Sequence, residues 1–176
     1  MTDWSIVESV LKYDCGWFIV GYDLVNQPSG DLAKYYWVDR PTNGLGIVAL
    51  CDGQVAMVEQ YRPKLKEMFL ECPGGDLKEG ESYAEAAARE LEEETGLQAG
   101  QLEVVTEYYP SATMRYKRGV VVATDLERGE PNPDDDEYIN WQFVPASKAL
   151  ELARTPPTTG WTLTTLLEAK ERGYLE

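Results

Sequence analysis

The sequence predicts an α/β fold in which a mixed sheet carries helices on its faces. A series of short segments rich in β-branched and aromatic residues, separated by turn formers, indicates the strands of the sheet. One helix with clear start and stop signals lies in the middle of the chain, and two further helical segments lie near its end. At 176 residues, the chain is long enough to bury a substantial core.

The predicted strands follow one another along most of the chain. They cover residues 17–22, 35–38, 46–50, 55–61, 68–72, 102–109, 120–124 and 139–144. Asp52-Gly53 predicts a tight hairpin between two of them, because both residues tolerate the backbone of a two-residue turn. Residues 145–155 and 162–172 are predicted to be helices.

Residues 83–95 form the best-defined predicted helix. Ser82 is a good N-cap residue, and Glu85 completes a capping box, while Gly96 suits the left-handed residue that ends a helix. A buried stripe of mostly small side chains is expected within an arc of roughly 100°. Its expected members are Ala84, Ala87, Ala88 and Leu91.

The same helix carries Glu90, Glu93 and Glu94 at spacings that place three carboxylates side by side. Like charges at this spacing repel, so cations are expected among them. Carboxylate oxygens are preferred ligands of hard divalent cations, which commonly share their coordination with substrate phosphates. The pattern therefore indicates Mg²⁺ or Mn²⁺ and phosphate chemistry, with a solvated acidic helix as the other interpretation.

The order of fixed residues in this region favours the first interpretation. Residues 75–97 read GDLKEGESYAEAAARELEEETGL and match the pattern G-x5-E-x7-R-E-U-x-E-E-x-G-U at every defined position, where U is aliphatic. The chain thereby resembles the Nudix hydrolases. The resemblance implies a Nudix α/β/α sandwich with a mixed sheet.

The resemblance also assigns roles to the motif residues. Glu90 and Glu94 would be the principal metal ligands, Glu93 would lie beside them, and Gly74 would lend its backbone carbonyl. The structural positions of the motif would be Gly75, Glu81, Arg89 and Gly96, and Glu81 would either support the metal ligands or bind the metal weakly itself. Arg89 can reach Glu85 or Glu93 on the helix, which suits a role in holding acids in place. Gly75 would permit a sharp turn after Pro73-Gly74.

Outside the motif, the chain is similar to the ADP-ribose pyrophosphatase branch, through the runs GWFIVGYDLVNQ, KYYWVDR and GIVALCDGQVAMVEQYRP. In that branch an N-terminal antiparallel β-region pairs with a second subunit. We therefore expect residues 1–40 to be a dimerisation element and residues 41–176 to be the hydrolase domain. An N-terminal hairpin without such a role is the alternative.

The branch resemblance suggests further site residues. Arg62 would hold a substrate phosphate or ribose, which suits a guanidinium, although a structural role is the alternative. Tyr22 and Trp37 are candidates for stacking on the base, with packing as the more common role for such rings. In this branch a loop carboxylate helps to activate the attacking water, and Asp135 and Glu137 fit that spacing; Glu93 is the rival base.

The expected reaction is metal-dependent hydrolysis of a nucleoside diphosphate linked to another moiety, with ADP-ribose giving AMP and ribose 5-phosphate as the first choice. A nucleotide sugar, NADH or a dinucleoside polyphosphate are alternative substrates. A sensor that binds ADP-ribose without catalysis is an alternative from another class, and the retained acidic residues disfavour it.

Composition limits the remaining functions. A formal charge of −15 without histidine argues against binding nucleic acid or an anionic membrane. No apolar leader or long apolar run is present, so a cytoplasmic protein is expected. Cys15, Cys51 and Cys72 lack metal or disulfide spacing and are expected to be reduced thiols in or near the core. The acidic excess suggests adaptation to high salt, with an ordinary acidic protein as the alternative.

Overall fold

The computed structural model describes residues 4–131 and 138–175. The chain divides into two compact units. The first contains the chain up to Asn43 together with Tyr109–Lys117, and the second contains Gly44–Tyr108 and the chain from Arg118 onward. The sequence pattern did not indicate that 109–117 would belong to the first unit.

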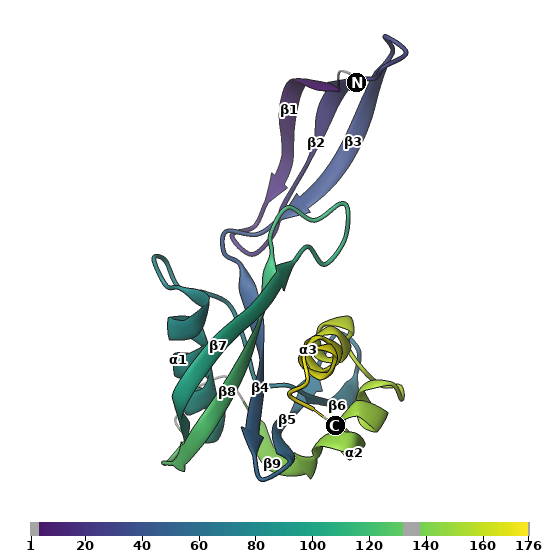
Figure 1. Ribbon diagram of the computed structural model, residues 1–176. Coiled ribbons are helices and arrows are strands. Elements are labelled where there is room, and N and C mark those ends of the chain that lie inside the picture. The colour runs from purple at the N-terminus through teal and green to yellow at the C-terminus, as the bar shows by residue number, and fades with distance from the viewer. Residues whose placement is uncertain (1–3, 132–137, 176) are drawn as a thin grey trace. The chain divides into compact units, whose positions relative to one another are not determined.

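The first unit is a three-stranded antiparallel sheet in the order β1-β2-β3 (Figure 1). Its strands are β1 (Ser5–Asp14), β2 (Ile19–Asn26) and β3 (Leu32–Asp39). The first of these was not predicted, because nearly all of its side chains are exposed and it lacks the buried face that marks most strands. The segment 109–117 joins β3 through two backbone hydrogen bonds at Val38, one with Thr113 and one with Arg115.

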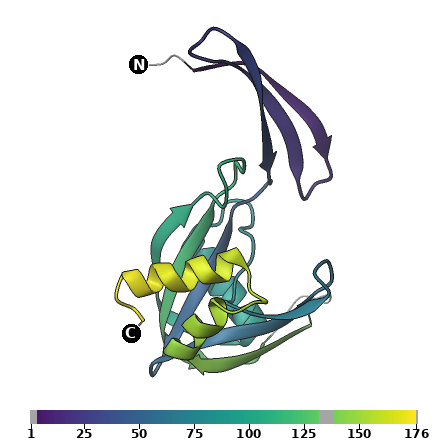
Figure 2. The same cartoon turned by 90° about the vertical axis from the view of Figure 1, so that its right-hand side faces the viewer.

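The second unit has its strands in the order β6-β5-β4-β8-β7, and β9 pairs with β5. These strands are β4 (Gly44–Cys51), β5 (Gln54–Arg62), β6 (Glu67–Glu71), β7 (Leu97–Tyr108), β8 (Arg118–Arg128) and β9 (Ile139–Pro145). Strands β4 and β8 are parallel and the other pairs are antiparallel, which confirms the mixed sheet (Figures 1 and 2).

The predicted hairpin at Asp52-Gly53 is confirmed. Both residues have positive φ, 49° and 74°, as a two-residue type I′ hairpin turn requires. Strands β4 and β5 pair only next to this turn, through Leu50 with Val55 and Cys51 with Gln54. Beyond it, β5 pairs with β9 on one side and β6 on the other.

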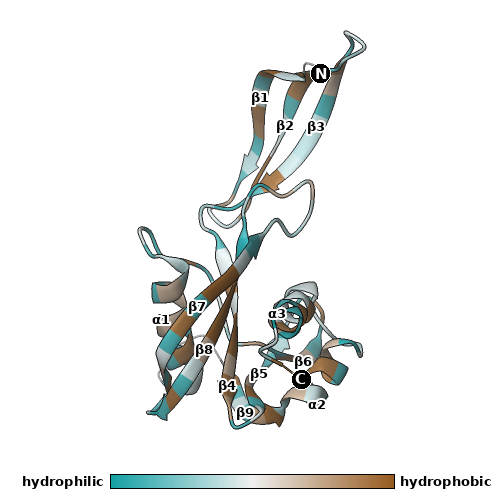
Figure 3. Cartoon of the chain, viewed as in Figure 1, coloured by the Kyte–Doolittle hydropathy of each residue, from teal (hydrophilic) through white to brown (hydrophobic). Residues whose placement is uncertain are grey.

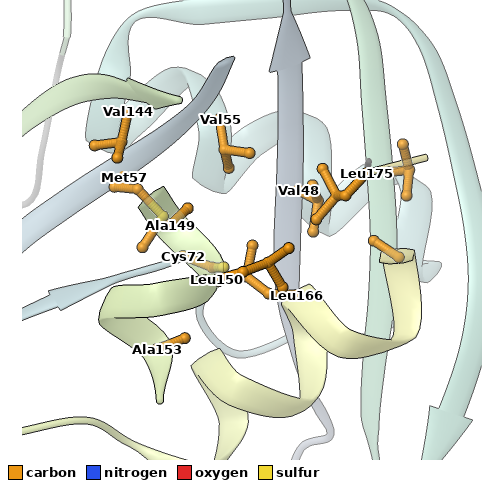
Figure 4. Close-up of a cluster of buried hydrophobic side chains, with 12 residues drawn as sticks. Val48, Val55, Met57, Cys72, Val144, Ala149, Leu150, Ala153, Leu166 and Leu175 are labelled. Atoms are coloured by element: carbon orange, nitrogen blue, oxygen red, sulfur yellow. The ribbon is translucent and has the colours of Figure 1, made fainter. Parts of the chain in front are cut away.

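Helices cover both faces of this sheet. They are α1 (Tyr83–Thr95), α2 (Ala146–Ala153) and α3 (Gly160–Glu171). Successive strand residues point to opposite faces, so Ile47 packs in the cluster that contains Leu91 of α1. Val48 packs with Leu150 of α2 and Leu166 of α3 (Figure 4). The middle of β8, between the two helix layers, is hydrophobic (Figure 3). The α/β/α sandwich is thereby confirmed.

The cysteines differ in their surroundings. Cys72 is fully buried, which raises the pKa of its thiol, and Cys51 is half-buried. Cys15 is exposed, so the expectation of a core or near-core thiol is wrong there, because it lies in the turn between β1 and β2. Among the described residues, no helix combines the length and apolar character needed to cross a membrane.

Candidate active site

Helix α1 begins and ends where its sequence signals predict. Ser82 accepts a hydrogen bond from the Glu85 amide, and the Glu85 carboxylate accepts one from the Ser82 amide at 2.8 Å, so the capping box is complete. Gly96 ends the helix in the left-handed conformation, with φ 71°. These two ends fix the stretch that carries Glu90, Glu93 and Glu94.

The buried face of α1 is broader than predicted and is turned toward the acidic side. Ala86 is fully buried and Ala88 is exposed, so the expected stripe was wrong at those positions. Glu94 is only 6% exposed and lies within the buried face, not on its edge. Burial of a carboxylate is costly without a hydrogen-bond donor, and Glu94 has one in the loop before the helix.

That loop is Gly74-Gly75, which both principal acids contact. The Gly74 amide donates to Oε2 of Glu94 at 2.9 Å. A Cβ added to Gly75 would lie 2.4 Å from Oε1 of Glu90, so a side chain here would displace the carboxylate that Arg89 also holds. Gly74 itself has φ 146° and lies against the Leu45 carbonyl. The close approach to Glu90 is thus the constraint at Gly75, where the sequence suggested a sharp turn.

Arg89 holds the acidic residues of the motif together. Its guanidinium donates to both oxygens of Glu81 at 2.8 and 2.9 Å, and to Glu90 and Glu93 at 2.8 Å each. It also donates to the Asp76 carbonyl at 3.0 Å. Of the two partners that helical spacing allowed, Glu93 is used, because Glu85 serves the helix cap.

This network changes the acidity of its members. The hydrogen bonds from Arg89 are the main reason that the pKa of Glu81 falls from 4.5 to about 2. The same bonds raise the pKa of Arg89 above its usual value. Arg89 therefore supplies a fixed positive charge that offsets the repulsion among the neighbouring carboxylates.

The donor set suits a divalent cation in its chemistry. Glu90 and Glu94 bring carboxylate oxygens to the same glycine pair, in a space that a side chain at Gly75 would fill. Within residues 4–131 and 138–175, no three acidic, histidine or cysteine side chains stand close enough together to hold an ion without rearrangement. One oxygen each of Glu90 and Glu93 is bound to Arg89.

Arg62, at the end of β5, is paired with a buried acid. Its Nε and Nη2 donate to Oε2 of Glu71 at 2.8 and 2.5 Å, and its side chain is 36% exposed. Sequence reasoning missed Glu71, although an acid within the apolar run MFLEC, directly before Pro73-Gly74, was a usable signal.

Four predicted site residues remain, namely Tyr22, Trp37, Asp135 and Glu137. Tyr22 and Trp37 belong to the first unit. The Tyr22 ring lies 4.8 Å from Nζ of Lys34, and Trp37 donates from Nε1 to Asp23 and lies 4.6 Å from the Arg115 guanidinium. Both rings thus have packing partners. Asp135 and Glu137 lie outside the described residues.

Comparisons with known proteins identify the family of the chain. The model of the NUDIX domain matches residues 40–162, so the chain belongs to the Nudix family and the protein is a Nudix hydrolase. Members of this family generally use divalent metal ions.

Two relatives are similar over most of the chain. An ADP-ribose pyrophosphatase of Bacillus subtilis is 33% identical over 135 residues, which covers 74% of this chain and 72% of the relative. A methanol dehydrogenase activator of Bacillus methanolicus is 32% identical over 133 residues, covering 73% and 71%. The crystal structure of an ADP compounds hydrolase superposes with a TM-score of 0.85 at 22% identity and covers 98% of this chain and 97% of that one. This last likeness concerns the fold.

Proposed function

We propose that the protein hydrolyses the pyrophosphate linkage of ADP-ribose to AMP and ribose 5-phosphate with the help of a divalent cation. The observation that supports this most is the contact of Glu90 and Glu94, on α1, with the Gly74-Gly75 loop. The similarity to the ADP-ribose pyrophosphatase of Bacillus subtilis supports the choice of substrate.

Glu90, Glu94 and the Gly74 carbonyl would hold Mg²⁺ or Mn²⁺, with Glu93 beside them. When bound, the ion would supply positive charge at the phosphate oxygens and lower the pKa of a coordinated water. Arg89 keeps the carboxylates in place, and Arg62 binds a phosphate oxygen of the substrate.

The proton of the attacking water needs an acceptor from the protein. Glu93 is one candidate, since it lies on the acidic side of α1 with its side chain 26% exposed. Asp135 and Glu137 are the others, by resemblance to ADP-ribose pyrophosphatases. Replacing each acid in turn by its amide shows which one is the general base, because loss of the general base lowers kcat by about 100-fold or more.

A panel of substrates tests the proposal. Purified protein with Mg²⁺ is incubated with ADP-ribose, a nucleotide sugar, NADH and a dinucleoside polyphosphate, and products are separated by chromatography. We expect ADP-ribose to give the highest kcat/KM. A preference for another compound would replace the substrate, and binding of ADP-ribose without turnover would support the sensor alternative.

We further propose that the first unit forms a homodimer with a second copy of the chain. Strand β1 exposes Ile6, Leu11 and Tyr13 by 58–61%, and Trp17 after it is 66% exposed. So many exposed apolar side chains on one small sheet are typical of a protein interface. Sedimentation equilibrium at micromolar concentration is expected to give twice the chain mass, and a monomer would contradict the proposal. We also propose that the protein resides in the cytoplasm.

A further inference from the structure

Glu71 is a fully buried acid with no role in the proposed metal binding or proton transfer. It ends β6, directly before Cys72-Pro73-Gly74, and its side chain has no exposed surface. A buried carboxylate is costly to keep unless partners satisfy it. The partners of Glu71 therefore indicate what its burial achieves.

Both oxygens of Glu71 are satisfied, and they join separate parts of the second unit. Oε2 accepts from Nε and Nη2 of Arg62 on β5, and Oε1 accepts from the Thr159 hydroxyl at 2.7 Å. Thr159 is the N-cap residue of α3, and its hydroxyl lies 3.1 Å from that of Thr162. One carboxylate thus links a strand end, the start of the glycine loop and the start of α3.

This arrangement fixes Arg62 without using all of its donors. Two of its nitrogens bond to one carboxylate oxygen, while Nη1 donates to no group in residues 4–131 and 138–175. The side chain remains about one third exposed. A guanidinium held in this way keeps one nitrogen for an anion and loses little freedom when it binds one.

Arg62 pairs with Glu71 although another acid, Glu67, lies opposite it on the neighbouring strand. Glu67 lies directly across from Arg62 in the antiparallel register of β5 and β6. Glu67 is exposed and does not pair with Arg62, which reaches the buried Glu71 instead. Attraction to the nearest acid across the strand pair does not explain this choice.

We propose that Glu71 is a positioning residue, which orients Arg62 to bind a phosphate oxygen of the substrate. The inference rests on the proposed role of Arg62 in substrate binding. Thr159 acts with Glu71 by fixing the opposite carboxylate oxygen.

Affinity for inorganic pyrophosphate, measured by calorimetry in EDTA, tests this without catalysis. Both Glu71→Gln and Arg62→Lys are expected to weaken binding about tenfold. The double variant is expected to bind no more than about twofold more weakly than either one, since both act on the same contact. Glu67→Gln is the matched control and is expected to bind like the parent.

Kinetics with ADP-ribose separate positioning from a purely structural role. Glu71→Gln is expected to raise KM about as much as Arg62→Lys does, with little change in kcat, because a contact to a phosphate oxygen is made throughout the reaction. A structural role would lower the melting temperature and the active fraction and leave KM unchanged. If Glu71→Gln does not fold, Thr159→Val loosens the same carboxylate and is expected to weaken pyrophosphate binding about threefold.

Parent-like pyrophosphate affinity in folded Glu71→Gln, or losses that multiply in the double variant, would overturn the inference; if Glu71→Gln does not fold, parent-like affinity in Thr159→Val would do so. A parent protein that binds pyrophosphate through Arg62 and Glu71 but does not hydrolyse ADP-ribose would overturn only the proposed substrate.

Discussion

Glu94 on α1 is buried against the rest of the fold and is also a proposed metal ligand. Its hydrogen bond from the Gly74 amide explains how a carboxylate can lie in a buried helix face. The motif predicts that Glu94 is a metal ligand. Its burial was not predictable from helical periodicity, because it depends on a donor 20 residues away along the chain.

Replacement of Glu94 by glutamine is expected to lower kcat at least about 100-fold, because the amide loses the charge that holds the cation. The amide oxygen can still accept from Gly74, so the melting temperature should change by only a few degrees. Glu92→Gln on the same helix is the control, since Glu92 is exposed and contacts Gln98. Equal activity of Glu94→Gln and the control would contradict the assignment.

A substitution at Gly75 tests the importance of the close contact between the loop and Glu90. Gly75→Ala would place a methyl group 2.4 Å from Oε1 of Glu90, so the loop or the carboxylate must move. We expect a loss of about 1–3 kcal/mol in the free energy of unfolding, measured by urea denaturation, together with reduced activity. Gly160→Ala meets no neighbouring atom and should leave stability unchanged or slightly higher. Stability of Gly75→Ala equal to that of the parent would show that this contact is not a constraint.

The elements that the sequence predicted well are those determined by interactions between residues close together in the chain. The ends of α1 were predictable because Ser82, Glu85 and Gly96 act within a few residues. Strand β1 was missed, because its mostly exposed side chains leave no alternation between buried and polar positions. The division of the chain, with 109–117 in the first unit, depends on pairing with Val38 far away in sequence.

Glu81, in the loop before α1, is paired with Arg89 on α1, and this pairing makes the stability of the protein depend on pH. Glu81 has a pKa of about 2 in the folded protein, against an ordinary 4.5, mainly because Arg89 donates to it. The resulting stabilisation is present above pH 4.5 and is lost as the pH falls toward 2.

Glu81→Gln is therefore expected to be less stable than the parent at pH 7, by about 1–2 kcal/mol, with the difference shrinking below pH 4.5. Urea denaturation at several pH values measures it. Glu79→Gln changes an exposed acid nearby and should show no such dependence. A difference that is constant from pH 7 to pH 3 would exclude the ion pair as its source.

Across the whole molecule, the charge of −15 is the feature with the widest effect. Self-repulsion destabilises a compact acidic chain, and salt screens it, with a Debye length of about 8 Å at physiological ionic strength and about 3 Å at 1 M. An ordinary acidic protein gains most of this benefit below about 0.5 M salt. Adaptation to high salt would extend the gain into the molar range.

Thermal unfolding from about 0.05 to 2 M KCl distinguishes these alternatives. Under the high-salt hypothesis, the melting temperature should continue to rise above 0.5 M, by about 5 °C or more, which corresponds to 1–2 kcal/mol for a chain of this size. A melting temperature that does not change with KCl would count against the hypothesis.

The central claim is that Glu90 and Glu94, with the Gly74-Gly75 loop, hold the cation that the hydrolysis requires. Anomalous diffraction from crystals grown with Mn²⁺ and a non-hydrolysable ADP-ribose analogue, in which a methylene group replaces the bridging oxygen of the pyrophosphate, tests it most directly. We predict a manganese peak bound by oxygens of Glu90 and Glu94, next to the two phosphorus groups of the analogue. A peak bound to other residues, or no peak at Mn²⁺ concentrations that support turnover, would contradict the claim.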